Sequence, residues 1–286
     1  MDDTLLLVLR GVIQRHVSPD VWAWLIEKAG QSKQFTIAFA ATPRKTGKQR
    51  VSLTGAEEVA IGKLRPGFSV RGWTIDRLTR VWLIMNLPAD VKDVYIRSIE
   101  TLFPTAEMNE LVALYSALPV LAYPESWKHR CAEGIRSNIA DVLESIMCNN
   151  PYPAEHLDEP AWNQLILKAI FTDKPIEQVI GLDQRANVVL ADTLSDYSHE
   201  RWAAHREVNL QLWRFVGPFI NASIFPDIQR IAQSSNREER EAAVLACLQS
   251  TYAPARALVE NTDELRAIVQ SGITWNAFAQ RISLTV

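Results

Sequence analysis

The chain has 286 residues, of which 48% are hydrophobic and 22% charged, and its formal net charge at pH 7 is -3. These values are typical of a globular protein, so they exclude a mainly disordered chain, and the small net charge excludes a chain that binds polyanions over its whole surface. Nine tryptophans are many for this length. Tryptophan fills cores, anchors interfaces and stacks on ligands, so the count alone does not decide between these roles.

The start of the chain is acidic, and its first apolar run, Leu5 to Leu9, is short. A signal peptide begins with basic residues and continues with about 7–15 apolar ones, and a membrane span needs roughly 18–20 apolar residues, so neither is expected here. The three cysteines, Cys131, Cys148 and Cys247, lack metal-ligand spacing and are expected to be reduced. We therefore expect a cytoplasmic protein with no metal and no other cofactor.

Residues 1–72 have the least regular pattern of the chain. Residues 35–39 alternate between apolar and polar and are the one candidate strand, although the neighbouring alanines also favour a helix. The basic, turn-rich segment from Pro43 to Arg50 is expected to be a loop. Thr54 and Glu57 have the spacing of a capping box, which predicts the start of a helix.

From about residue 74 onward, apolar residues recur at spacings of three and four, which indicates helices. In 74–86 the residues on one face are Ile75, Leu78, Val81, Trp82 and Met85. Further helices are predicted after Pro88, before Pro119, and at about 124–134, 137–148, 160–171, 187–205, 209–217, 222–233, 236–250 and 262–282. Few β-branched runs are present and Asn-Gly turns are absent, so the sequence predicts an all-α fold.

Residues 225–246 resemble a HEAT-type helical hairpin, with two short helices joined by a polar turn and small residues on the inner face. The sequence therefore predicts antiparallel helical hairpins in a degenerate HEAT-like α-solenoid, although no strict repeat period is present. We expect one all-α domain over 1–286. It would consist of a less regular N-terminal part with a basic loop, 1–72, and a helical array, 73–286.

Charge is unevenly distributed along the chain. Residues 32–80 contain ten basic and three acidic residues, so this segment carries +7 and the remainder -10. Arg44, Lys45, Lys48 and Arg50 are a candidate anion-binding site for a phosphate, a phosphorylated metabolite or an acidic partner surface. The alternative is a solvated loop that keeps the protein soluble or pairs with the acidic remainder. The patch is short and lacks any nucleic-acid motif, so we expect no nucleic-acid partner.

Polar residues that can carry chemistry concentrate between 133 and 206. Asn and Asp in apolar helical surroundings need hydrogen-bond partners, which makes these stretches candidates for a ligand pocket. The candidate ligand-binding residues are Arg136, Asn138, Asn150, His156, Trp162, Asn163, Lys168, Asp183, Arg185, Asp196, His199, Glu200, Arg201 and Trp202.

Asp192, Asp196 and His199 are spaced to share one helix face, which can hold a divalent metal or supply acid–base groups. The alternative is that Asp196 and Glu200 are exposed and pair with Arg201 or another basic side chain. HExxH and a paired ExxH motif are absent, so we predict no metal site and assign no catalytic residue. The sequence also lacks GxSxG, a nucleophilic Cys–His pattern and GxGxxG, which leaves acyl transfer and dinucleotide binding without support.

Trp162 and Trp202 lie inside these polar stretches. They can wall an organic ligand, or they can simply pack between helix pairs, as most tryptophans do.

Several long strings occur in one order along the chain and together resemble the EboA family of metabolite traffic proteins. They are NELVALY at 109–115, AEGIRSN at 132–138, NPYPAEH at 150–156, AWNQ at 161–164, LKA at 167–169, GLDQRAN at 181–187 and SDYSHERWAA at 195–204. The resemblance covers most of the chain. The basic segment with the ATPR string that leads into it, at 41–44, and the residues after Asn221 match less firmly.

The resemblance implies a helical protein and a pathway context. EboA proteins are encoded in bacterial and algal gene clusters, together with a prenyltransferase-like membrane protein and several enzyme-like proteins. These clusters are associated with the synthesis or movement of a secondary metabolite, including export of a sunscreen-pigment precursor in cyanobacteria. The family assigns no reaction and no catalytic residue.

The favoured interpretation is a non-catalytic cytosolic protein of such a cluster, which binds a small metabolite or a partner protein of the same cluster. One alternative is an enzyme that acts on a small phosphorylated or prenylated metabolite. His156, Lys168, Asp183, Arg185, Asp196 and His199 would then supply acid–base and anion-holding groups. A second alternative is a peripheral membrane adaptor, in which the basic segment at 43–50 makes weak contact with anionic lipid.

Overall fold

The protein was analysed as a computed structural model that describes residues 3–283. Within these residues the structure contains 18 α-helices, several short 3-10 helices and no strand, so the all-α prediction is confirmed. The candidate strand at 35–39 lies inside a helix. The only extended pairing among the described residues is an isolated bridge between Arg50 and Thr74.

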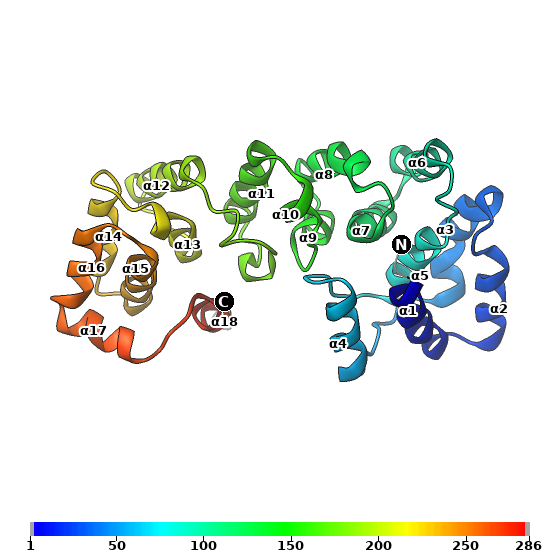
Figure 1. The fold of residues 1–286 in the computed structure, drawn as a ribbon, viewed down its shortest axis with the longest axis horizontal. Helices are drawn as coiled ribbons and strands as arrows, with labels where there is room; N and C mark the ends of the chain where they lie inside the picture. The colour runs from blue at the N-terminus through cyan, green and yellow to red at the C-terminus, as the bar shows by residue number, and fades with distance from the viewer. Residues whose placement is uncertain (1–2, 284–286) are drawn as a thin grey trace. The chain divides into compact units, whose positions relative to one another are not determined.

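The chain divides after Ala161 into two compact units, which we call unit 1 and unit 2 (Figure 1). The predictions of one continuous domain and of HEAT-like stacking stay predictions. None of the described helices combines the length and the apolar composition that crossing a membrane requires.

Unit 1 is organised around the helix at 75–85. Its helices are α1 (Asp3–His16), α2 (Pro19–Lys28), α3 (Ser32–Thr46), α4 (Gly55–Leu64), α5 (Ile75–Met85), α6 (Lys92–Glu100), α7 (Met108–Ala117), α8 (Lys128–Ile135), α9 (Ala140–Met147), α10 (Tyr152–His156) and the start of α11 (Glu159–Phe171). Helix α5 packs against α1, α3 and α7, and all of its residues except Arg77 are buried. It therefore forms the centre of this unit.

The N-terminal part is more regular than its sequence indicates, because four helices, α1 to α4, precede residue 73. Helix α3 also continues through Pro43 into the basic segment that we expected to be a loop. Proline lacks the amide hydrogen that would bond to the carbonyl of Phe39. That carbonyl instead accepts a hydrogen bond from Nε of Arg80 at 3.0 Å, so a side chain of α5 satisfies the backbone of α3. Only the residues from Gly47 onward form the loop.

Helix α5 carries buried charges. Nη1 of Arg80 donates to Oδ2 of Asp76 at 3.0 Å, and Nη2 lies 3.6 Å from a carboxylate oxygen of Glu110. Burial lowers the pKa of Arg80, and the nearby Asp76 carboxylate opposes that shift. The adjacent guanidinium of Arg77 lies 4.1 Å from the ring centroid of Trp73, and burial lowers its pKa to about 10. The ion pair of Arg80 and Asp76 therefore lies inside the core of unit 1.

Helix α4 begins with the capping box that the sequence predicts, and the same glutamate links α4 to α1. The side chain of Thr54 accepts from the backbone of Glu57, and Glu57 accepts from the backbone of Thr54 at 2.9 Å. Arg15 of α1 also donates to the Glu57 carboxylate, with Nη2 at 2.8 Å from Oε2. The Arg15 hydrogen bond, together with those from Thr54, lowers the pKa of Glu57 from its ordinary 4.5 to about 2.

The variant Glu57→Gln is expected to be less stable than the wild type at neutral pH, because glutamine can keep the cap but not the ion pair. Above pH 4.5 the wild-type carboxylate is charged in both folded and unfolded chains, so the difference is complete. As the pH falls toward 2 the folded-state carboxyl becomes protonated and the difference disappears. Urea unfolding of both proteins between pH 2 and 7 measures this. Arg15→Gln removes the same pair and should show the same profile, whereas a pH-independent difference would contradict the prediction.

Unit 2 contains the rest of α11, then α12 (Val188–Ala203), α13 (Trp213–Val216), α14 (Phe225–Ala232), α15 (Arg237–Gln249), α16 (Ala253–Glu260), α17 (Asp263–Gln270) and α18 (Trp275–Ser283). Helix α15 lies among α13, α14, α16 and α17 (Figure 1), and its residues 241–247 are buried. Asn236 caps its start, with its side chain accepting a hydrogen bond from the amide of Glu238. Gly217 allows a close approach here, because a Cβ at that position would lie 2.9 Å from Cα of Ala246.

Polar side chains fasten the last helix, α18, onto the rest of unit 2. The indole Nε1 of Trp275 donates to Oε1 of Gln249 at 2.9 Å, and Asn276 accepts from Nη1 of Arg214 at 3.1 Å. Arg281 forms an ion pair with the buried carboxylate of Glu241 on α15. Helix α18 therefore belongs to the packed structure of unit 2.

Candidate functional site

The predicted ligand residues are divided between the units. Arg136, Asn138, Asn150 and His156 belong to unit 1, and the other ten belong to unit 2. The two groups are therefore considered separately.

In unit 1, the side chain of Asn150 forms hydrogen bonds with backbone groups. Its Nδ2 donates to the carbonyl oxygens of Tyr115 at 3.2 Å and Ser145 at 3.0 Å, and its Oδ1 accepts from the amide of Tyr152 at 3.0 Å. These bonds use all but one of the hydrogen bonds that an asparagine side chain forms. Asn150 thus holds the turn between α9 and α10 against α7, and its side chain is buried.

The other three candidates of unit 1 are more exposed than Asn150. His156 is half-buried, with its ring 4.7 Å from that of Tyr152 and its Nδ1 3.1 Å from a carboxylate oxygen of Glu125. Arg136 and Asn138 are exposed just after α8. The partner of His156 is thus the exposed carboxylate of Glu125.

In unit 2, Trp162 and Asn163 hold α11 against the start of α12. Trp162 is fully buried, with the guanidinium of Arg185 5.0 Å from its ring centroid. The side chains of Asn163 and Asn187 exchange two hydrogen bonds, at 3.2 and 2.8 Å. Asn187 also caps α12 by accepting from the amide of Leu190. The burial of Trp162 favours the packing role that the sequence left open.

Asp183 likewise has a protein partner. Its two carboxylate oxygens accept from Nε and Nη2 of Arg214, both at 2.7 Å, in a bidentate pair. Arg214 also bonds to Asn276 of α18, so this pair connects three segments of unit 2. The half-buried Lys168 lies on α11.

Five side chains meet where α12 faces α14, and we call them the α12–α14 contact. Its members are Ser195, His199 and Trp202 of α12, and Asp227 and Arg230 of α14. Asp227 is buried, and its Oδ2 and Oδ1 accept from Ser195 Oγ and His199 Nε2, both at 2.6 Å. A carboxylate only accepts, so Nε2 of His199 carries the proton.

The ring of Trp202 completes this contact. It stacks on the buried ring of Trp213, with centroids 5.9 Å apart and an interplanar angle of 23°. The guanidinium of Arg230 lies 4.2 Å from the Trp202 centroid, and the His199 ring lies 5.8 Å from it. His199 and Trp202 were predicted from the sequence, whereas Asp227 and Arg230 were not. An acid in the first turn of a helix is usually exposed beside the helix dipole, so Asp227 gave no signal.

The remaining candidates of α12 point elsewhere. Asp196 and Glu200 are exposed, and Nε of Arg201 donates to the carbonyl of Glu207 at 2.7 Å. Residues 3–283 contain no group of three or more His, Cys, Asp or Glu side chains placed to hold a metal ion. The face that we considered from Asp192 to His199 therefore gathers no metal-ligand set in the described structure.

The four basic residues of the segment at 43–50 are exposed. Arg44 and Lys45 end α3, where positive charge complements the helix dipole, and Nζ of Lys45 lies 5.5 Å from the ring centroid of Trp24. Lys48 and Arg50 lie in the loop that follows. The other four arginines of the +7 segment have partners within unit 1: Arg65 pairs with Glu155, Arg71 with Glu58 and Arg80 with Asp76, and Nε of Arg77 donates to Oγ of Ser116. The anion-site prediction for the four exposed residues stays a prediction.

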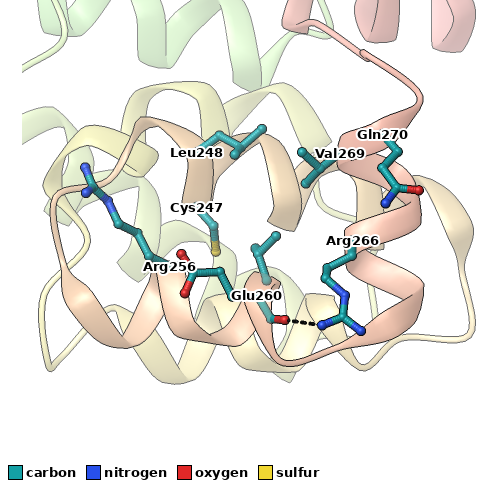
Figure 2. Close-up of a pocket in the computed structure, with 8 residues that line it drawn as sticks. Cys247, Leu248, Arg256, Glu260, Arg266, Val269 and Gln270 are labelled. Carbon is teal, nitrogen blue, oxygen red and sulfur yellow. Dashed lines mark hydrogen bonds between the residues drawn. The ribbon is translucent and has the colours of Figure 1, made fainter.

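A pocket of about 650 Å³ lies between α15, α16 and α17, within unit 2. Cys247, Leu248, Val259 and Val269 supply its apolar lining, and Arg256, Glu260, Arg266 and Gln270 supply its polar lining. In Figure 2 Arg256 and Arg266 lie at opposite ends of the pocket, with Glu260 between them. None of the residues that we predicted from the sequence lines it.

The polar groups of the pocket are partly held by the protein. Nε of Arg256 donates to the carbonyl of Ser250 at 2.9 Å, and Nη1 of Arg266 donates to the backbone carbonyl of Glu260 at 2.8 Å (dashed in Figure 2). These bonds fix both guanidinium groups at the rim. Burial raises the pKa of the Cys247 thiol to about 12, so it stays protonated at neutral pH.

Fold and pocket together define a class of protein: a helical protein with an open, mostly apolar cavity of the size that small molecules occupy. Comparison with protein families names the family. The model of the metabolite traffic protein EboA family matches residues 6–217, and the chain belongs to this family. The resemblance seen in the sequence is thus confirmed, and it gives the protein a role in metabolite handling. No curated protein and no solved structure matches the chain. The pocket, at residues 247–270, follows the matched residues.

Proposed function

We propose that the protein binds a small metabolite without transforming it, and that the pocket between α15, α16 and α17 is the binding site. The observation that carries this proposal is the pocket itself. Its volume of about 650 Å³ lies within the roughly 300–1,000 Å³ of small-molecule sites, which combine an apolar lining with a few placed polar groups. The family's role in metabolite handling supports the same conclusion.

The pocket favours a molecule with an apolar body and polar ends. Cys247, Val259 and Val269 offer an apolar surface, from which water is displaced when an apolar group binds. Arg256 and Glu260 offer one charge of each sign at the rim. A ligand that places a polar group at each end of an apolar body would use both kinds of lining.

The chemistry of the lining supports binding rather than catalysis. The eight lining residues include no histidine, and the one thiol among them, Cys247, has a pKa of about 12. General acid–base catalysis needs a group that titrates near the working pH, and nucleophilic catalysis by cysteine needs a thiolate. Within the pocket, the enzyme alternative would therefore rest on Glu260, the one carboxylate of the lining.

Filling the pocket tests the proposal. Val269→Trp places an indole in the cavity, whereas Val59→Trp adds the same side chain at an exposed position of α4 in unit 1. Each purified protein is mixed with a small-molecule extract of the producing cells, desalted and examined by native mass spectrometry. We expect one bound small molecule on the wild type and on Val59→Trp, and its loss from Val269→Trp with an unchanged melting temperature.

Equal occupancy of the two tryptophan variants would show that the pocket is not the site. The bound molecule is then released by denaturation and compared with the extract. Recovery with an unchanged mass supports binding without reaction. Recovery as a chemically altered product would favour the enzyme alternative instead.

A further inference from the structure

A second site, independent of the pocket, is assembled at the α12–α14 contact. The side chain of Asp227 is only 8% exposed, whereas that of His199, which it holds at 2.6 Å, is 52% exposed. Ser195 occupies the other carboxylate oxygen. A buried carboxylate thus fixes the orientation of an imidazole at the surface. The second ring nitrogen of that imidazole takes no part in this contact. Nδ1 of His199 makes no hydrogen bond to any residue from 3 to 283.

The guanidinium of Arg230 is positioned without the use of its N–H donors. The guanidinium of Arg230 lies 4.2 Å from the ring centroid of Trp202, and Trp202 is itself supported by the buried Trp213. Such cation–π contact fixes the position of a guanidinium while its five N–H donors remain available. Within the described part of the chain, the side chain of Arg230 forms neither a hydrogen bond nor an ion pair.

Both groups contact the same indole, which limits the distance between them. The Trp202 centroid is 5.8 Å from the His199 ring and 4.2 Å from the Arg230 guanidinium carbon, so these groups lie at most about 10 Å apart. Nδ1 of histidine accepts a hydrogen bond in the neutral ring and donates one in the imidazolium. It can therefore bind the hydroxyl of a protonated phosphate or a bare oxyanion.

We propose that Arg230 and His199 together bind one oxyanion group, phosphate or carboxylate, of a small molecule beside Trp202. The fork of a guanidinium matches both groups and bonds them through two nitrogens. The exposed carboxylates of Asp196 and Glu200 on α12 lie along the chain on either side of His199. They repel further negative charge, so the site takes a single small anion and no polyanion.

Nuclear magnetic resonance of the full-length, ¹⁵N-labelled protein tests this proposal. Sodium phosphate and, separately, sodium acetate are added at constant ionic strength, and the indole N–H of Trp202 and the ring signals of His199 are followed. We expect saturable shifts of both with at least one of the two anions. Saturation by phosphate alone assigns a phosphate ligand, and saturation by acetate assigns a carboxylate. Linear, unsaturated shifts with both anions would overturn the proposal.

Variants separate binding from a purely structural role. Arg230→Gln is expected to weaken anion affinity about tenfold or more, because it removes the charged donors. Arg230→Lys should retain part of the affinity, since it keeps the charge but loses the fork. Arg206→Gln removes an exposed arginine of the same unit and should bind as the wild type does. Equal affinity of Arg230→Gln and Arg206→Gln, with melting temperatures unchanged, would assign Arg230 to packing on Trp202 alone.

Discussion

Replacing Asp76 with alanine is expected to lower the free energy of unfolding of unit 1 by about 3–5 kcal/mol. The reason is the burial of Arg80, whose side chain is 3% exposed and loses its ion-pair partner on the same helix. The remaining partners are the carbonyl of Phe39 and the more distant carboxylate of Glu110, at 3.6 Å. They leave the buried charge only partly compensated. Urea unfolding followed by circular dichroism measures the effect.

Two further variants test whether loss of the buried ion pair causes this destabilisation. Asp90→Ala removes an exposed aspartate outside the helices and should change stability by no more than about 0.5 kcal/mol. Asp76→Asn keeps a hydrogen-bond acceptor for Arg80 without the charge and should fall between the two alanine variants. If Asp76→Ala and Asp90→Ala were equally stable, the buried ion pair of α5 would contribute nothing to the fold.

Replacing Trp162 with alanine is expected to cost unit 2 about 3–5 kcal/mol, because the substitution leaves a large cavity in a packed core. The indole is fully buried between α11 and the residues that precede α12, where Arg185 covers it. The variant should therefore lose stability in urea unfolding whether or not a ligand is present.

Trp202→Ala is the matched comparison in the same unit. That ring is half-buried, so its removal should cost clearly less. If Trp162 were instead the wall of a ligand site, Trp162→Ala would bind less ligand with nearly unchanged stability. That outcome would contradict its assignment to the core and restore the interpretation that the sequence left open.

Much of the fold was predictable because helix formation depends on nearby residues. Spacings of three and four marked α5 and the helices after it, and Thr54 with Glu57 marked the start of α4. The N-terminal part was underestimated for a related reason. Proline signals a helix end, yet α3 passes through Pro43 because Arg80, far along the chain, satisfies the freed carbonyl of Phe39. No local pattern contains that contact.

The candidate sites were less predictable. His199 and Trp202 stood out as polar and aromatic residues in one stretch, but their partners Asp227 and Arg230 lie on another helix and looked like ordinary surface charges. The pocket was not anticipated, since Cys247, Val259 and Val269 are unremarkable apolar positions of three different helices. A concave surface arises only when those helices pack.

By itself, the sequence determined that the protein is helical, where several helices begin, and that it belongs to the EboA family. These properties reside in periodicity, capping residues and long matching strings, all of which are local. The tertiary structure alone decided that Trp162 fills a core, that Asp227 orients His199, and that α15, α16 and α17 form an open pocket. Each of these depends on which helix faces meet, and that is set by packing over the whole of a unit rather than by any one stretch of the chain.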